Sequence, residues 1–82
     1  MSPLIGQIAL FPFDWPIEGW LRCDGRLLPI SQYQILYALL GNRFGGNGMH
    51  NFALPKLPPV KGENGGFLYY CIAAEGDFPA RI

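Results

Sequence analysis

The chain has 82 residues, half of them apolar, and its six basic and six acidic residues give a formal net charge of zero. Nucleic-acid binding needs a basic stripe that neutralises several phosphates, and an anionic membrane surface attracts polybasic segments. The charges of this chain stand singly along the sequence, so we expect neither partner.

The N-terminal residues MSPLIGQIALFPF lack the positive charge that opens a signal peptide. No apolar run approaches the roughly 20 residues that span a bilayer. We therefore expect a protein that is made in the cytoplasm and is not inserted into a membrane. Any location outside the cell would be reached by assembly or by a dedicated machine.

Aromatic residues are abundant for a chain of this size: two Trp, six Phe and four Tyr make up 15% of it. A domain this short buries only about 60% of the surface that its unfolded chain exposes, so its core is marginal. We interpret the aromatic surplus as a sign of self-association or docking, because exposed apolar patches usually mark interfaces. The alternative is a small, well-packed core with a few aromatic edges at the surface.

Cys23 and Cys71 are the only cysteines, and His50 is the only histidine. Without a secretion signal, two cysteines favour free, buried thiols over a disulfide. These three residues show no CxxC or HxH spacing and are too few for a metal site. The sequence therefore predicts no metal and no cofactor.

Three short strands are predicted in the first part of the chain. Leu4 to Phe11 form the first, and after an irregular loop Trp20 to Cys23 form the second. Asp24-Gly25 is typical of a hairpin turn, because glycine adopts a positive φ without steric cost and aspartate tolerates it. We therefore expect Arg26 to Leu28 to return beside the second strand.

A helix of about ten residues is predicted to begin at Ser31, too short to be stable without packing. Ser31 and Gln34 have the spacing of a capping box. Gly41 stands where a left-handed C-terminal cap is expected. Between them runs one apolar stripe, made by Ile35, Leu36, Leu39 and Leu40.

The segment from Asn42 to Asn51 is rich in glycine and asparagine. It follows a helix and contains no lysine or threonine, so it does not predict a phosphate-binding loop. We expect a long, ordered turn pinned by Phe44, followed by an extended piece from Phe52 to Pro55.

The clearest strand of the sequence runs from Phe67 to Ala74. It is apolar on both faces, which is typical of a central or interface strand. Residues 61–66 before it are predicted to form an exposed, mobile loop. Together the elements predict an α+β fold, a small single domain over residues 1–82 in which short β-strands and hairpins pack around one short helix.

Six short motifs stand in a fixed order along the chain. They are Gly6-Gln7-Ile8, Gly19-Trp20 with Cys23-Asp24-Gly25, Leu28-Pro29-Ile30, Leu36 to Gly41, Phe44-Gly45-Gly46-Asn47-Gly48, and Phe52-Ala53-Leu54-Pro55. Their order and spacing resemble the phage tail-collar domain family of tail fibres and microcystin-dependent proteins. Residues 70–73, Gly76 and Phe78-Pro79 also resemble the final strand and tail of that family.

One departure from the family pattern follows the last motif. Longer members continue from F-x-L-P into a long variable insertion that often carries histidines and the receptor-facing surface. Here Lys56-Leu57-Pro58-Pro59-Val60 and the sequence KGENGG lead directly to the last strand. The chain thus resembles a minimal collar without the insertion, and the family's metal-binding histidines are not carried over.

The resemblance implies a structural or adhesive component of a phage tail or a tail-like injection machine, located in the virion tail or tail-like particle. It implies docking to other tail or fibre proteins or to copies of itself, with a trimer favoured. Trp20 is expected to anchor the core. The structural motif comprises Trp20, Cys23, Asp24, Gly25, Ser31, Gly41, Phe44, Gly45, Gly46, Phe52 and Pro55. The expected interface comprises Trp15, Phe67, Tyr69, Tyr70 and Phe78.

Two other classes of function have sequence features of their own. The main alternative is a carbohydrate-binding module for a receptor glycan, because Trp15, Tyr33, Tyr37 and the asparagines of residues 42–51 are types that stack on and hydrogen-bond to sugars. An enzyme would need two of Asp14, Glu18 and Asp24 as a carboxylate pair, or Cys23 or Cys71 beside His50 as a nucleophile–base pair. We expect no enzyme, since a turn and solvated loops explain these residues.

Overall fold

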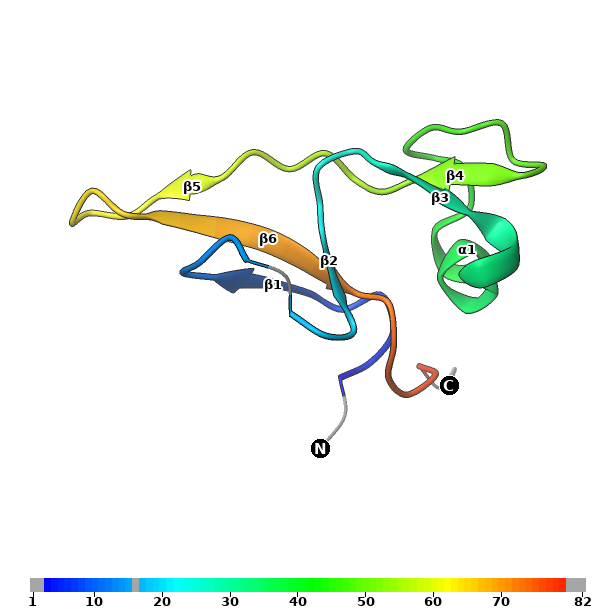
Figure 1. The fold of residues 1–82 in the computed structure, drawn as a ribbon, viewed down its shortest axis with the longest axis horizontal. Helices are drawn as coiled ribbons and strands as arrows, with labels where there is room; N and C mark the ends of the chain where they lie inside the picture. Colours follow the sequence, from blue (N-terminus) through cyan, green and yellow to red (C-terminus); the bar gives the residue numbers. More distant parts are fainter. Residues whose placement is uncertain (1–2, 16, 80–82) are drawn as a thin grey trace.

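The computed structural model describes residues 3–15 and 17–79, and in it three short strands precede one short helix and three strands follow it (Figure 1). The strands are β1 (Ile8–Phe11), β2 (Trp20–Arg22), β3 (Leu27–Pro29), β4 (Asn51–Ala53), β5 (Val60–Lys61) and β6 (Phe67–Ala73). A 3-10 turn, η1 (Ile30–Gln32), leads into α1 (Gln34–Leu40), the single α-helix of the described residues. The predicted α+β fold class is confirmed.

β6 is the central strand of the larger of two sheets. β1 pairs with it along one side, and β2 and β5 pair with it along the other, all antiparallel (Figure 1). Ile72, for example, lies between Ile8 of β1 and Leu21 of β2. The prediction of a central strand is therefore confirmed, because β6 has hydrogen-bonded neighbours along both of its edges.

The buried core lies where one face of this sheet meets α1 and the smaller sheet. That smaller sheet consists of β3 and β4, with Leu28 opposite Phe52. The largest fully buried side chains come from both sheets, the helix and their connections: Phe52, Leu36, Leu54, Ile72 and Cys23. Each buried apolar side chain of this kind contributes about 1.5–3 kcal/mol, so packing holds a helix that is too short to form alone.

β2 and β3 do not form the hairpin that Asp24-Gly25 predicts. Gly25 has the expected positive φ of 82°, but there the chain passes from the larger sheet to the smaller one. Asp24 forms a bridge with Lys56 instead. The prediction was wrong because a turn dipeptide sets the local backbone only, and β3 pairs with β4 of the smaller sheet instead.

The helix begins later than the capping-box pattern predicts. Ser31 lies inside η1, and α1 begins at Gln34 after Tyr33 without any side-chain cap. The N–H of Ile30 donates to the carbonyl of His50 (3.0 Å), and the N–H of Tyr33 donates to the carbonyl of Ile30 (3.1 Å). Tertiary pairing and a tight turn therefore take the place of the predicted cap.

The buried face of the helix is rotated from the predicted stripe. Of the predicted stripe, Leu36, Leu39 and Leu40 pack in or against the core and only Ile35 is exposed. Tyr33 and Tyr37 complete the buried face, which has the i, i+3, i+4 and i+7 spacing from Tyr33 to Leu40. Gly41 ends the helix with a positive φ of 62°, as expected, although its ψ of −152° is not that of a left-handed cap.

β1 is shorter than the strand predicted from Leu4. A turn at Ile5 and Gly6 precedes it, and Leu4 forms a single parallel bridge with Asp77. Gly6, with a φ of 90°, allows this turn without steric cost. The buried Ile5 is thereby directed into the core rather than along the sheet.

An asparagine, not Phe44, holds the loop between α1 and β4. Phe44 is 45% exposed. The Asn47 side-chain oxygen accepts three backbone hydrogen bonds, from Met49, His50 and Asn51, at 2.9, 2.8 and 3.2 Å. The expected pinning by Phe44 was wrong, because one carboxamide satisfies several backbone donors in a segment with few side chains to bury.

Residues 61–66 form the tip of the β5–β6 hairpin. The N–H of Gly62 donates to the carbonyl of Gly66 at 2.6 Å, and the N–H of Gly65 donates to the carbonyl of Gly62 at 3.1 Å. The tip stands at the end of the molecule away from α1 (Figure 1). The segment is largely exposed, as predicted, and hydrogen bonds define a turn within it.

Candidate docking surface

Four aromatic side chains lie together on the face of the larger sheet opposite the core. Phe11 of β1 and Trp20 of β2 meet edge to face, with ring centroids 5.2 Å apart. Phe13 lies 5.8 Å from Phe11 and stacks on Trp15 at 4.5 Å with an interplanar angle of 10°. Such pairs add about 0.5–1.5 kcal/mol beyond burial, so this aromatic cluster fixes the loop between β1 and β2 on the sheet.

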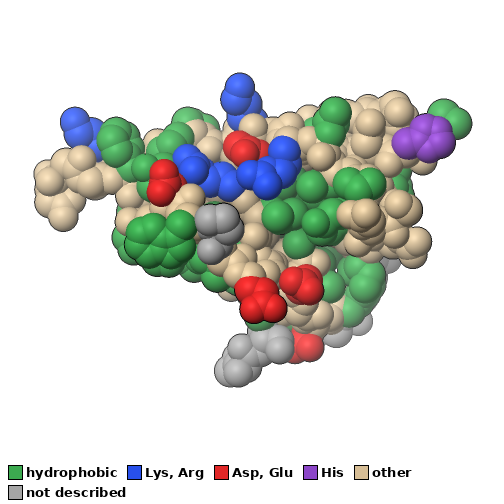
Figure 2. Space-filling model, viewed as in Figure 1, with side chains coloured by type: hydrophobic (Ala, Val, Ile, Leu, Met, Phe, Trp, Pro, Cys, Tyr) green, Lys and Arg blue, Asp and Glu red, His purple; other side chains and the backbone are tan. Residues whose placement is uncertain are grey.

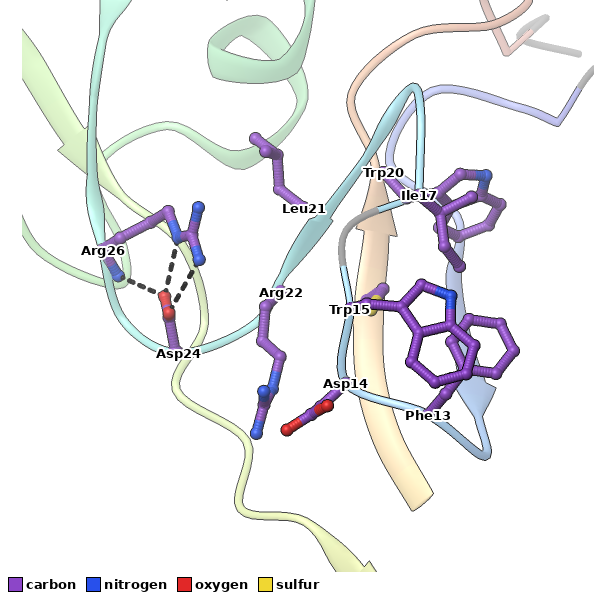
Figure 3. Close-up of a pocket in the computed structure, with 10 residues that line it drawn as sticks. Phe13, Asp14, Trp15, Ile17, Trp20, Leu21, Arg22, Asp24 and Arg26 are labelled. Carbon is purple, nitrogen blue, oxygen red and sulfur yellow. Dashed lines mark hydrogen bonds and ion pairs between the residues drawn. The ribbon is translucent and has the colours of Figure 1, made fainter. Parts of the chain in front are cut away.

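A pocket of about 130 Å³ opens beside the aromatic cluster, over β2 and β6 (Figure 3). It is lined by Phe13, Asp14, Trp15, Ile17, Trp20, Leu21, Arg22, Asp24, Arg26 and Cys71. Small-molecule sites usually enclose about 300–1,000 Å³. The pocket is therefore smaller than this range and is of a size for about one side chain.

Three charged side chains at this pocket, Arg22, Asp24 and Arg26, interact with other groups of the protein. The guanidinium of Arg22 lies 4.1 Å from the centre of the Tyr69 ring, a cation–π geometry. Asp24 accepts hydrogen bonds from Nε (3.0 Å), Nη2 (2.9 Å) and the backbone N–H (3.1 Å) of Arg26 (Figure 3). The side-chain hydrogen bonds lower the pKa of Asp24 and raise the pKa of Arg26. Both groups of this pair therefore stay charged at neutral pH.

The two free thiols lie on opposite faces of the larger sheet. Cys71 lines the pocket opposite Arg22 of β2, whereas Cys23 is buried in the core. Burial raises the pKa of the Cys23 thiol to about 11, and burial also raises the pKa of Cys71 against the opposing effect of Arg22. Because the thiolate is the reactive form, neither cysteine is an activated nucleophile. Cys71 is only half-buried, less than predicted.

The five aromatic residues predicted as an interface do not form one surface. Trp15, Phe67 and Phe78 are exposed, but Phe67 begins β6 and Phe78 lies beyond its other end. Tyr70 packs against the core, and Tyr69 lies under Arg22. Of the five, Trp15 alone belongs to the aromatic cluster. Tyr69 lies on the same face of the sheet, opposite Phe11, but Arg22 covers its ring, whereas Tyr70 points to the core face.

The predicted structural motif falls into several environments. Cys23, Phe52 and Pro55 are buried, and Ser31 is exposed like Phe44. Gly25, Gly41, Gly45 and Gly46 all have positive φ. Trp20 is not the core anchor that we expected, since it is only half-buried and belongs to the aromatic cluster on the other face of the sheet.

Three residues of the aromatic cluster and its neighbouring pocket were not singled out from the sequence: Phe11, Phe13 and Arg22. A signal for the first two exists, because Phe11, Phe13 and Trp15 follow one another at every second position. Arg22 gave no such signal. Its place over Tyr69 depends on the register of β2 against β6.

Of the three carboxylates named for an enzyme, only Asp14 and Asp24 share the pocket, and there Asp24 is paired with Arg26. Tyr33 and Tyr37 pack against the core, and the Tyr37 hydroxyl donates to the carbonyl of Gly48 at 3.2 Å, so neither ring is presented to a sugar with Trp15. His50 lies in the loop before β4, at the end of the molecule opposite the hairpin tip (Figure 2). It is therefore no partner for a cysteine of the larger sheet.

Comparison with protein-family models identifies the family of the chain. A model of the Phage Tail Collar Domain matches residues 6–59, more than half of the chain. The chain belongs to this family. No curated protein and no solved structure matches it. The match to the collar domain spans β1 to the end of the Pro58-Pro59 pair, so it stops before β5 and β6.

Collar domains are structural parts of phage tails and not an enzyme family, so membership indicates a structural role in a tail or tail fibre of a virion. Within residues 3–15 and 17–79, no helix has the length and apolar character to cross a membrane. The same residues contain no group of three or more His, Cys, Asp or Glu side chains placed to hold a metal ion.

Proposed function

We propose that this collar domain docks to copies of itself or to another tail or fibre protein, in a phage tail or tail-like injection machine that attaches to a host. The observation that carries the proposal is the aromatic cluster. Its outermost member, Trp15, is 65% exposed beside a pocket of a size for one side chain. Exposed Trp beside a pocket is typical of the centres of protein interfaces.

Three copies are the stoichiometry that we propose, because fibre members of the family are commonly trimeric. The marginal core of an 82-residue chain gains stability from association, since a partner that binds only the folded state shifts the folding equilibrium by mass action. We propose further that residues 1–82 form one domain and that the particle is assembled in the bacterial cytoplasm.

The chain is proposed to be a minimal collar, in which the variable insertion of longer members is reduced to the β5–β6 hairpin. The hydrogen-bonded turn at residues 62–66 closes this hairpin directly. This connection is consistent with docking through the collar domain itself rather than through a variable insertion.

The test is the composition of purified tail particles from cells that encode the chain. We expect quantitative mass spectrometry to find the chain in a fixed ratio to the other tail proteins. Trp15→Ala should reduce its incorporation at least several-fold. Met49→Ala serves as the control, because Met49 is 77% exposed in the loop before β4, outside the larger sheet. Particles that lack the chain altogether would overturn the proposal.

A further inference from the structure

β1 is an edge strand with one open side. It pairs with β6, and within the described residues no other backbone hydrogen bond reaches residues 8–11. The carbonyl of Gln7 accepts the N–H of Ala73 at 2.9 Å. Because antiparallel ladders alternate, the backbone groups of Ile8 and Leu10 point away from β6. Figure 1 shows no strand of the chain beyond β1 on that border of the sheet.

The opposite border of the sheet is protected against strand pairing, and β1 is not. There β2 has three residues, one of them Arg22, and β5 has two residues, one of them Lys61, preceded by Pro58 and Pro59. Lysine, proline and very short strands are devices by which proteins block pairing at an edge. β1 has four residues, IALF, none of them charged, and Pro12 follows its end. The contrast indicates that this border is left open for a partner strand.

Exposed apolar side chains flank the open edge on both faces of the sheet. Ile8 and Leu10 are each 42% exposed on the core side. On the other face, Trp15 is connected to β1 through Phe13 and Phe11, and Figure 3 shows Phe13 and Trp15 on the side of β6 where β1 lies. We call Ile8, Leu10 and Trp15 the edge surface. Four paired residues alone bury far less than the roughly 1,000 Å² of a stable interface, so the edge surface must take part in any contact.

We propose that the partner at this edge is a second copy of the chain, whose β1 pairs antiparallel with β1 and joins two larger sheets into one. The inference rests on the proposed docking function and names its contact. In the register that places Ala9 opposite its own copy, Ile8 lies opposite Leu10 of the second copy, and the reverse. Both members of each pair direct their backbone groups outward, so they exchange hydrogen bonds. Neither strand carries a charge, so no like charges meet.

A twofold contact of this kind closes on itself and gives pairs. Combined with the three copies proposed above, it gives six. An even number of copies is therefore the signature of the β1 contact. Because the contact is short, we expect pairing that is reversible and depends on concentration.

The experiment is analytical ultracentrifugation of the purified chain over a wide concentration series, with two lysine variants. Leu10→Lys places a charge in the contact, and Leu27→Lys is the control, because Leu27 is exposed on β3 in the smaller sheet. We expect two or six copies for the wild type and for Leu27→Lys. For Leu10→Lys we expect pairing to weaken at least tenfold, with thermal unfolding confirming that the variant is folded.

Amide hydrogen exchange of the wild type supplies a second readout that needs no variant. We expect the amides of Ile8 and Leu10 to be protected at high concentration and to exchange on dilution. A monomer throughout with these amides unprotected would overturn the β1 contact, and so would a trimer that Leu10→Lys leaves intact. The trimer result would leave the proposed function standing. Absence of the chain from tail particles would instead remove that function and leave the β1 pair as a property of the purified chain.

Discussion

Gly46 is a position where a side chain has no room. A Cβ there would lie 2.5 Å from Cα of Phe52 and 2.8 Å from the carbonyl oxygen of Asn51. Gly65 has nearly the same φ, 91° against 92°, but no atom within 4 Å of the corresponding position. The two glycines therefore separate the cost of a left-handed backbone from the cost of a close approach.

We expect Gly65→Ala to lower the free energy of unfolding by about 1 kcal/mol, the cost of placing alanine at positive φ. Gly46→Ala should lower it by at least 3 kcal/mol, because β4 must also move. Urea unfolding followed by circular dichroism measures both values. Equal losses would show that the loop before β4 yields without disturbing the strand.

The buried thiol of Cys23 makes stability depend on alkaline pH. Its pKa is raised from the usual 9.0 to about 11, chiefly by burial. Between these values the folded state keeps the proton and the unfolded state loses it, so the free energy of unfolding is unaffected below pH 9 and falls as the pH rises towards 11. We expect the wild type to lose about 1 kcal/mol more than Cys23→Ala between pH 7 and about pH 10, measured by urea unfolding. Parallel losses in the two proteins would contradict a buried thiol.

The buried face of α1 distinguishes two neighbouring residues of the predicted apolar stripe. Leu36 is 1% exposed and Ile35 is 42% exposed. We expect Leu36→Ala to cost about 2–5 kcal/mol, since it leaves a cavity in the core. Ile35→Ala should cost less than about 1 kcal/mol. Thermal unfolding of the two variants measures the difference, and comparable losses would support the stripe predicted from sequence, which contains both residues.

The elements that could be predicted from sequence are those whose signal is local. β6 was predictable because its residues are apolar on both faces, and Gly41 because a helix end needs a permissive backbone. The start of α1 was not, since the N–H of Ile30 finds its acceptor at His50, twenty residues along the chain. The partner of β2 was hidden for the same reason: Arg22 lies opposite Cys71. Pairings of such separation leave no pattern in a local window.

The docking surface shows the same division. The alternating aromatic residues Phe11, Phe13 and Trp15 indicate a cluster in the sequence. The sequence does not indicate that β6 pairs with β1 on one side and with β2 on the other. That arrangement brings Trp20 to Phe11 and forms the pocket. Chemistry-bearing residues were therefore visible in the sequence, while the site is a product of the topology.

The whole molecule places its β5–β6 hairpin tip and its Gly/Asn loop at opposite ends (Figure 1). At the tip, a Cβ at Gly65 meets nothing within 4 Å, and the turn touches no other element through its hydrogen bonds. In the Gly/Asn loop, Asn47 accepts hydrogen bonds from the residues that lead into β4, whose Phe52 is fully buried. A change of length at the tip is therefore confined to the turn, whereas a change at the loop reaches the core.

We expect four Gly/Ser residues inserted after Asn64 to lower the free energy of unfolding by less than about 1 kcal/mol, because the cost of closing a longer loop grows slowly with its length. The same insertion after Gly46 should cost several kcal/mol, since it separates Asn47 from the close approach of Gly46 to β4. The two insertion variants have the same amino-acid composition, and urea unfolding measures the difference in their free energies of unfolding. A tolerant tip would support the proposal that this hairpin stands where longer collars carry their insertion. Unfolding by the tip insertion would show instead that the short turn is needed to align β5 with β6.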